Sequence, residues 1–568
     1  MIFRELDITP LPVGWTGRTG GALLYRWVRS RWFAYAVGVV AMLVTNATEA
    51  FIPRVLERVV DLVTREAATP GAPDSLYSTL ALLILVLVAQ AFGRRYWRLS
   101  LGQETHRAAA TLKEAVWLTA RYFPRERLER DLSVGNLMNV ATGDVATGRL
   151  IFGWTILGLL DFLFFTTAAF VSMVLLDPGI AALCGLAVAL VPFATYRIAE
   201  AEYARHTTAQ ETLSGLNVLV TQAVSSIKVQ RLSQSERFWT ARLTALAEEY
   251  RRKRLAVVDL SLRFVPLTGL PPILCHLILC AVGIPAVFEN RLSLGEFVAF
   301  QGYIVLLQGP FAQIGPLLSE WQRGRASLAR VTAVLATPRA PGFEVSSPDP
   351  QPVPGTPVFS IRDLRFTHAD AQRELFRGLT LEIAPGERIG ITGPVGAGKT
   401  TFLEILAGHR REFNGEVRLH GVDIRRYSYP HLSREVTLVE QRPFLFADSI
   451  RRNVLLDRPG TDDAVRAWLD LAGLSDDIDR FPRGLDTPLG EWGINLSGGQ
   501  KQRLTIARAL ATSPRILLLD DCLSAVDVTT EERILANLDR ALPGATIVWV
   551  AHRPSTLRHC TRIVRFEP

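Results

Sequence analysis

Eight consecutive residues, Gly393 to Thr400, have the composition of a loop that binds phosphate. They read Gly-Pro-Val-Gly-Ala-Gly-Lys-Thr and fit the pattern G-x-x-x-x-G-K-[ST]. Glycines allow backbone N–H groups to curl around phosphate oxygens, and a following helix N-terminus adds partial positive charge. We expect Lys399 to reach the β- and γ-phosphates of a nucleotide. The residues expected to enclose the phosphates are Gly393, Pro394, Val395, Gly396, Ala397, Gly398, Lys399, Thr400 and Thr401.

A second motif, which is acidic, is expected to supply a metal site for the same nucleotide. The apolar run 515–519 reads as a buried strand, and it ends in Asp520 and Asp521. It follows the phosphate loop by about 120 residues. We expect Asp520 to hold Mg²⁺ through water, while the hydroxyl of Thr400 ligates the same ion. ATP and Mg²⁺ are therefore the predicted cofactors.

The segment Leu496-Ser497-Gly498-Gly499-Gln500 fits no general nucleotide-binding pattern. It is similar to the signature sequence of ATP-binding cassette (ABC) transporters, and Lys501-Gln502-Arg503 follows it as in that family. The chain resembles the ABC exporters over nearly its full length. Gly295-Glu296-Phe297 and the run 322–330 also match the exporter pattern around the last apolar span.

The resemblance implies roles for further residues. Gln441 matches the Q-loop glutamine, which touches the metal and the attacking water, and His552 matches the switch histidine at the γ-phosphate. The run 524–527 resembles the D-loop, and 490–493 resembles the loop that senses the membrane helices. Asp521 stands where the family places its water-polarising base. The implied catalytic set is therefore Asp521, His552 and Gln441, and the implied metal set is Thr400, Gln441 and Asp520.

The resemblance also implies a dimer. One such ATPase domain with six spans is a half-transporter, so two chains must pair. In the family each ATP lies between the P-loop of one chain and the signature of the other. The residues facing the partner's nucleotide would then be Ser497, Gly498, Gly499 and Gln500.

Two positions depart from the family pattern. Family members commonly have Glu where this chain has Asp521, which is one methylene shorter. We expect a site that binds ATP and hydrolyses it slowly, as in the degenerate-site subunit of heterodimeric multidrug-type exporters; the alternative is that Asp521 moves forward and works. The second departure is His368, where the family usually stacks Tyr on adenine. Either His368 stacks there, or it lies at the surface and adenine is held elsewhere.

An ATPase domain with these exporter motifs should be preceded in the chain by a membrane domain. A bilayer core about 30 Å thick requires about 20 apolar helical residues per span. Six segments qualify, and we expect an α-helical membrane domain with long cytoplasmic extensions, followed by an α/β P-loop ATPase domain. The predicted spans are residues 32–53, 77–93, 154–176, 180–196, 262–288 and 297–318.

The connections between the spans alternate in length and charge. Those over 94–150 and 197–259 are long and rich in arginine, and the N-terminal arm is basic as well. The positive-inside rule places both termini, both long loops and the ATPase domain in the cytoplasm of a multi-pass membrane protein, in a bacterial inner or plasma membrane. Short coupling helices are expected near 123–131 and 221–231.

A proline-dense segment separates the two predicted domains. We expect a transmembrane domain over 1–335 with an N-terminal elbow and the coupling loops, a linker over 336–357, and the nucleotide-binding domain over 358–568. The net charge of +8 agrees with basic cytoplasmic loops rather than with a nucleic-acid partner. The five cysteines show neither metal spacing nor a disulfide framework.

Three ionisable residues interrupt the spans: Glu49, Asp161 and His276. Ionisable groups within the bilayer are costly and usually face a cavity or a partner. They would either line a substrate path or lie at the water interface and at helix contacts. The apolar, aromatic spans favour a small or amphipathic substrate.

The sequence favours an ATP-driven exporter half that works in the lipid bilayer and pairs with a second, non-identical half-transporter. Two alternatives within the same class are a homodimer that uses Asp521 as its base and an importer built on the exporter fold. A membrane ATPase that regulates a partner without transport is the alternative from another class.

Overall fold

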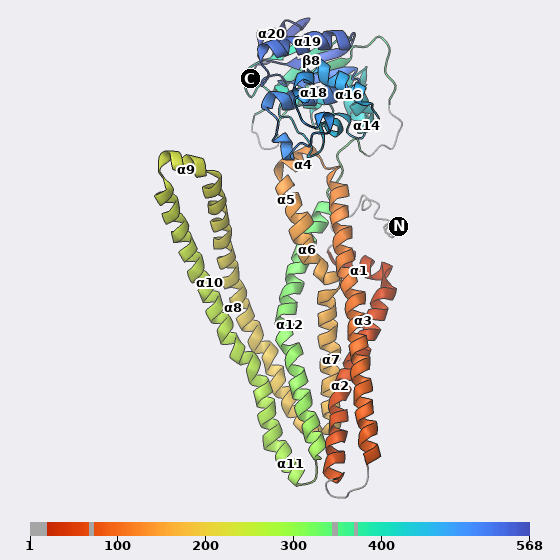
Figure 1. Ribbon diagram of the computed structural model, residues 1–568, viewed down its shortest axis with the longest axis vertical. Helices are drawn as coiled ribbons and strands as arrows, with labels where there is room; N and C mark the ends of the chain where they lie inside the picture. Colours follow the sequence, from red (N-terminus) through yellow and green to blue (C-terminus); the bar gives the residue numbers. More distant parts are fainter. Residues whose placement is uncertain (1–19, 67–72, 344–349, 369–372, 568) are drawn as a thin grey trace. The chain divides into compact units, whose positions relative to one another are not determined.

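The computed structural model describes residues 20–66, 73–343, 350–368 and 373–567 (Figure 1). The chain forms two compact units. The first comprises Met1–Leu118 and Gly135–Ala336, and the second comprises Thr119–Val134 and Thr337–Pro568. The second unit therefore includes a short segment that is inserted, in sequence, between two parts of the first.

The first unit is entirely helical in its described part. Its long helices have apolar stretches, and short helices join them (Figure 1). The long helices are α2 (Trp32–Glu66), α3 (Pro73–Ala120), α7 (Trp154–Leu176), α8 (Pro178–Ser225), α10 (Glu236–Ile278) and α12 (Leu294–Leu335). The short ones are α1 (Gly20–Ser30), α5 (Val134–Asn139), α6 (Val145–Gly148), α9 (Ile227–Ser233) and α11 (Ile284–Phe288).

Five of the long helices each contain one predicted span, whereas the predicted fifth span, 262–288, begins in α10 and continues through a π-helical turn (Leu279–Gly283) into α11. Among the described residues, four helical stretches are long and apolar enough to cross a membrane: Trp32–Thr64, Leu76–Ala120, Val134–Leu176 and Leu294–Leu335. Shorter apolar stretches, Pro178–Ala187 and Pro272–Phe288, mark the fourth and fifth spans. The remaining parts of those two spans include side chains that the structure does not describe.

Polar contacts fix the ends of these helices. The Asp177 carboxylate accepts hydrogen bonds from the backbone N–H groups of Gly179 and Ile180, at 2.7 and 2.9 Å, so α8 starts at once after α7. Ser293 and Glu296 form a reciprocal capping box at the start of α12. Asp61 of α2 accepts a bond from the Ser293 hydroxyl at 3.0 Å, which joins α2 to the same helix start.

The second unit carries two β-sheets. The first is antiparallel, in the order β2-β1-β4-β5, and the second is parallel, in the order β6-β7-β8-β3-β9. The strands are β1 (Phe359–Phe366), β2 (Phe376–Ile383), β3 (Arg388–Thr392), β4 (Asn414–Leu419), β5 (Val422–Asp423), β6 (Val436–Val439), β7 (Ile516–Asp520), β8 (Thr546–Val550) and β9 (Arg562–Arg565). The central strand β7 is buried along its whole length, as its apolar run predicts.

Helices cover the parallel sheet of the second unit. They are α13 (Lys399–Leu406), α14 (Tyr429–Glu435), α15 (Ile450–Leu455), α16 (Asp462–Leu471), α17 (Ser475–Ile478), α18 (Gly498–Leu510), α19 (Val528–Ala541) and α20 (Pro554–Leu557). One hydrophobic cluster lies between the antiparallel sheet and α13, and another lies between β7 and α18. The short helix α4 (Arg125–Arg130) belongs to this unit and contacts it through ion pairs.

Candidate functional site

The phosphate loop connects β3 to α13. Gly393 and Gly398 have φ values of 149° and 87°, which side-chain-bearing residues rarely adopt. A Cβ on Gly393 would lie 2.5 Å from the carbonyl oxygen of Phe566, so no larger residue fits. Val395 at the tip is 98% exposed. The loop therefore has the strand, tight turn and helix N-terminus that phosphate binding requires.

The Lys399 ammonium lies inside this loop. Its Nζ donates hydrogen bonds to the carbonyl oxygens of Gly393 and Pro394, both at 2.8 Å. Burial lowers the pKa of Lys399, whereas the carboxylates of Asp520 and Asp521 act in the opposite direction. The cation is thus held within the turn, close to the two acids of the second motif.

Asp520 ends β7 and is only 3% exposed. Burial raises the pKa of its carboxyl group above the ordinary aspartate range, and a hydrogen bond from Thr400 opposes this shift. Thr400 and Asp520 therefore meet, although they are far apart in the sequence. A hydroxyl and a buried carboxylate are hard oxygen ligands of the kind that Mg²⁺ takes, so these two residues fit the predicted metal site.

The three predicted catalytic side chains come from three loops at the same edge of the parallel sheet. Asp521 follows β7 with φ of 43°, a left-handed conformation that aspartate tolerates. Gln441 follows β6, and its Nε2 donates to Asp521 Oδ2 at 3.3 Å. His552 follows β8 and lines the same small recess as Asp521. The carboxyl ends of neighbouring parallel strands bring these residues together.

His368 lies beside the phosphate loop. Its Nε2 is 3.4 Å from the Thr401 hydroxyl, and its ring meets the edge of Phe366 with centroids 5.0 Å apart. The side chain is half-buried. His368 is therefore near enough to the phosphate loop to contact a nucleotide bound there. The next four residues, 369–372, lie outside the described part.

The signature segment forms the start of α18. Ser497 caps the helix in a reciprocal box with Gln500, and Gln500 Nε2 donates to Asp477 Oδ1 at 2.9 Å. A Cβ on Gly499 would lie 2.8 Å from the carbonyl oxygen of Ala525. Within the described residues no hydrogen bond joins Ser497, Gly498, Gly499 or Gln500 to the phosphate loop. The exposed Ser497 is therefore available to another molecule.

Several arginine and glutamine contacts around the site were not predicted from the sequence. Arg508 of α18 donates to the carbonyl oxygens of Phe444 and Asn453, each at 2.8 Å, and joins the segment after Gln441 to the signature helix. Burial lowers the pKa of Arg508 to about 10. Gln502 Nε2 donates to the Ser524 hydroxyl at 3.1 Å. No local sequence signal indicates these partners, because each contact joins segments distant in the chain.

A further unpredicted contact ties the switch segment to the D-loop. Arg553, next to His552, donates to the backbone oxygens of Val526 and Ser524 at 2.7 and 2.8 Å. It also pairs with Glu531, which is fully buried. Burial alone would raise the pKa of Glu531, but bonds from Thr556, Arg553 and Ser555 hold it below the ordinary range.

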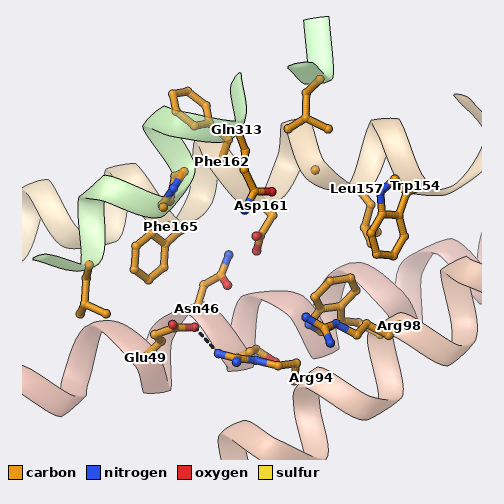
Figure 2. Close-up of a pocket in the computed structure, with 17 residues that line it drawn as sticks. Asn46, Glu49, Arg94, Arg98, Trp154, Leu157, Asp161, Phe162, Phe165 and Gln313 are labelled. Carbon is orange, nitrogen blue, oxygen red and sulfur yellow. Dashed lines mark hydrogen bonds and ion pairs between the residues drawn. The ribbon is translucent and has the colours of Figure 1, made fainter. Parts of the chain in front are cut away.

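A second candidate site lies within the helical unit (Figure 2). Residues of α2, α3, α7 and α12 enclose a cavity of about 290 Å³. Glu49 and Asp161 both line it, so for these two residues the cavity alternative holds. Glu49 pairs with Arg94 at 2.8 Å. His276 does not line this cavity; its Nδ1 is 2.7 Å from the carbonyl oxygen of Pro272 in its own helix.

Comparison with known proteins assigns the family. Residues 35–311 match the model of the ABC transporter transmembrane region, and residues 376–524 match that of the ABC transporter ATP-binding domain. The "Multidrug resistance-like ATP-binding protein MdlA" of Escherichia coli is 31% identical over 96% of this chain and 91% of its own length. An "ATP-dependent lipid A-core flippase" of Thiobacillus denitrificans is 28% identical over 96% and 93%.

A solved structure gives the same fold. The bacterial Atm1-family ABC exporter with ATP bound superposes with a TM-score of 0.76, covering 96% of this chain and 94% of its own, at 23% sequence identity. The predicted fold, a helical transmembrane domain followed by a nucleotide-binding domain, is confirmed. With the phosphate loop, the signature and the membrane helices in one chain, this protein belongs to the ABC transporters of the exporter type and couples ATP hydrolysis to transport.

Proposed function

We propose that this chain is one half of an exporter with two non-identical halves, and that the ATP site built on its own P-loop hydrolyses slowly. The observation that carries the proposal is the carboxylate at position 521. Asp521 stands at the base position and is one methylene shorter than glutamate. Its Oδ2 accepts a bond from Gln441, which would itself contact the metal and the attacking water.

The Asp521 carboxylate reaches less far than a glutamate carboxylate would, and this difference is large enough to slow hydrolysis. One methylene retracts a carboxylate by roughly 1.5 Å, about one C–C bond. A misplacement of about 1 Å can cost ~100-fold in rate. Asp521 would therefore polarise water poorly while the ATP contacts of the site remain intact.

The geometry of the second unit supports a proposal for the nucleotide contacts. Lys399 would exchange its bonds to the Gly393 and Pro394 carbonyls for bonds to the β- and γ-phosphates. Thr400 and Asp520 would hold Mg²⁺, which neutralises phosphate charge when bound. His368 would stack on the adenine, and His552 would contact the γ-phosphate.

Two observations support pairing with a second half-transporter. Ser497 is exposed at the start of α18, without a bond to this chain's phosphate loop. At the tip of α9 the apolar side chains of Ile227, Val229 and Leu232 are 49%, 63% and 87% exposed. Exposed apolar groups of this size mark surfaces that another protein covers.

The family supports a proposal for the location and the cargo of this protein. The membrane-spanning helices require a lipid bilayer, and the basic loops favour an orientation with the ATPase domain and both termini in the cytoplasm. The relatives named for multidrug resistance and for lipid A-core flipping support a small or amphipathic cargo moved outward.

The test compares two substitutions in the complex purified from native membranes through a tag on this chain. Asp521→Ala should leave most of the steady-state ATPase activity, because its site contributes little turnover. Ser497→Arg should remove nearly all of it, because the new cation enters the productive site that this signature forms with the partner's P-loop. Ala536→Arg, at an exposed position of α19 outside the signature, controls for a general effect of added charge.

The alternative arrangement gives the opposite pattern. In a homodimer with Asp521 as base, the chain expressed alone hydrolyses ATP briskly, and Asp521→Ala abolishes this activity. A positioned base contributes roughly 100- to 10,000-fold, so the two patterns are easily distinguished. Brisk activity of the isolated chain that depends on Asp521 would refute the proposal of non-identical halves.

A further inference from the structure

The cavity in the helical unit contains four ionisable side chains, and only two of them pair with one another (Figure 2). Glu49 of α2 and Arg94 of α3 form an ion pair at 2.8 Å. Asp161 of α7 and Arg98 of α3 also line the cavity, and in the described part of the chain neither forms an ion pair. Asp161 and Arg98 therefore face the cavity without a direct ion pair, although they lie close enough to act on one another electrostatically.

Two buried hydrogen-bond donors also line the cavity. The Trp97 indole N–H has no hydrogen-bond acceptor within the described ranges, and the Asn46 amide nitrogen makes no well-formed hydrogen bond there but interacts with Asp161. Asn46 is 4% exposed and Trp97 is 8% exposed. Figure 2 shows the Asn46 amide directed toward Asp161. Buried polar groups in proteins are nearly always satisfied, so an unsatisfied donor that faces a cavity indicates a missing ligand.

The wall formed by α12 adds an acceptor. Pro310 lies inside this helix and has no N–H, so the carbonyl oxygen of Leu306 loses its usual helical partner. Both residues line the cavity. A Cβ built on the neighbouring Gly309 would meet no atom within 4 Å. The helix backbone is thus open to a ligand at this position.

Aromatic rings supply the apolar surface of the cavity. Trp97, Trp154, Phe162 and Phe165 line it, and the Arg98 guanidinium lies 5.4 Å from the centre of the Trp97 ring. The volume of about 290 Å³ is at the lower end of the range for ligand sites. The cavity therefore suits a compact apolar body that carries polar ends.

We infer that this cavity binds a zwitterionic amphiphile, with its cationic group at Asp161 and the Leu306 carbonyl and its anionic group at Arg98 and the Trp97 N–H. The reason is charge balance. Asp161 lies within the predicted span 154–176, where an ionisable group usually faces a partner, and Arg98 lies five residues beyond the predicted span 77–93. A ligand with a single charge would pair directly with only one of Asp161 and Arg98, whereas a zwitterion pairs with both. The inference rests on the proposed transport function, since it assigns a cargo class.

Two kinds of molecule carry this chemistry: a small apolar peptide with free termini, and a lipid with an ammonium-phosphate headgroup. The experiment uses isothermal titration calorimetry on the complex in a non-ionic detergent. One arm compares Phe-Phe with its amide, which keeps only the positive charge, and with its N-acetyl derivative, which keeps only the negative charge. The other arm compares lysophosphatidylethanolamine with lysophosphatidylglycerol of the same acyl chain.

The zwitterion of at least one arm should bind about tenfold more tightly than its singly charged analogues, because it gains a second charged hydrogen bond. The arm in which this occurs identifies the source. Equal affinity within both arms, or no binding in either, would overturn the inference. These comparisons use the unmodified protein, so they do not depend on the folding of a variant.

Substitutions then assign the two ends. Arg98→Gln should weaken the zwitterion and the negative analogue about tenfold and leave the positive analogue unchanged. Asp161→Asn should weaken the zwitterion and the positive analogue about tenfold and leave the negative analogue unchanged. Arg95→Gln is the matched control, because Arg95 lies on α3, is exposed, and does not line the cavity. Equal losses for all ligands in Arg98→Gln and Asp161→Asn would contradict the assignment.

Transport is measured separately, as ATP-driven uptake of the bound zwitterion into inverted membrane vesicles. Selective binding without uptake would leave the cavity assignment standing and count against the proposed transport direction. ATPase activity intact in the complex, with no charge selectivity in either arm, would refute the cargo class and leave the proposed exporter standing.

Discussion

Removing the Arg410 guanidinium should release α4 from the ATPase unit. Arg410 follows α13 and is 5% exposed. Its Nη2 donates to both carboxylate oxygens of Glu129 at 2.9 and 3.0 Å, and its Nη1 lies 3.5 Å from Glu126. It also pairs with the buried Glu404 of α13. Two acids of α4 and one acid of the P-loop helix thus share one cation, and Arg410→Met removes it.

The free-energy cost of Arg410→Met depends on which partners each acid retains. Removing one partner of a buried pair costs about 3–5 kcal/mol. Glu404 retains Arg125 at 2.7 Å, so we assign roughly half of that cost to it. Glu129 and Glu126 have side chains 48% and 24% exposed and can be hydrated, so each loses about 0.5 kcal/mol. The sum is about 2.5–3.5 kcal/mol for the local opening of α4.

Hydrogen–deuterium exchange of the full-length complex measures this opening directly. A loss of about 2.5–3.5 kcal/mol accelerates exchange in residues 119–134 by about 70- to 400-fold. Arg418→Met is the matched control, because Arg418 pairs with Glu416 at the surface, with both side chains nearly half exposed. Unchanged exchange in 119–134, or equal acceleration in the control, would refute the reasoning that this ionic cluster holds α4.

Three further predictions concern the ATP site. Lys399→Ala should strongly reduce photolabelling of this chain by azido-ATP, because it removes a charged phosphate contact; unchanged labelling would contradict the assignment. His368→Ala should weaken ATP binding by about 1–3 kcal/mol in a nucleotide titration, while His368→Tyr preserves it; equal affinities would exclude stacking. Arg508→Met should lower the melting temperature of the ATPase unit by roughly 5–10 °C in calorimetry, since about 2–3 kcal/mol of hydrogen bonding is lost, whereas the exposed Arg515→Met should not.

Local sequence patterns were sufficient for the elements that hold the ATP site. The phosphate loop follows from three glycines at fixed spacing, and in the structure they adopt the positive φ angles that exclude other residues. The buried strand β7 follows from its apolar run and its terminal acids. Short helices overlap the two regions expected for coupling: α4 lies within 123–131, and α9 begins within 221–231 and extends two residues beyond it. These features depend on neighbours in the chain, so a reader of the sequence can find them.

The long helices were predicted for the same reason, but the sequence did not predict the surroundings of their polar residues. The sequence indicated that Glu49, Asp161 and His276 interrupt apolar spans. It left open which of them face a cavity. Glu49 and Asp161 line one, while His276 bonds to its own helix. The rotation of a helix about its axis is set by packing against other helices, and that information is spread over four helices of the bundle.

By itself, the sequence determined the family, the order of the two domains and the position of the phosphate loop, because each depends on short motifs and local periodicity. Only the tertiary structure decided which distant groups meet. It brought Gln441 to Asp521, Arg508 to the segment after the Q-loop, and Arg410 to α4. It also placed Asp161 and Arg98 in one cavity without a direct ion pair. Such contacts join residues tens to hundreds of positions apart, and no local pattern records the partner that a long polar side chain reaches after folding.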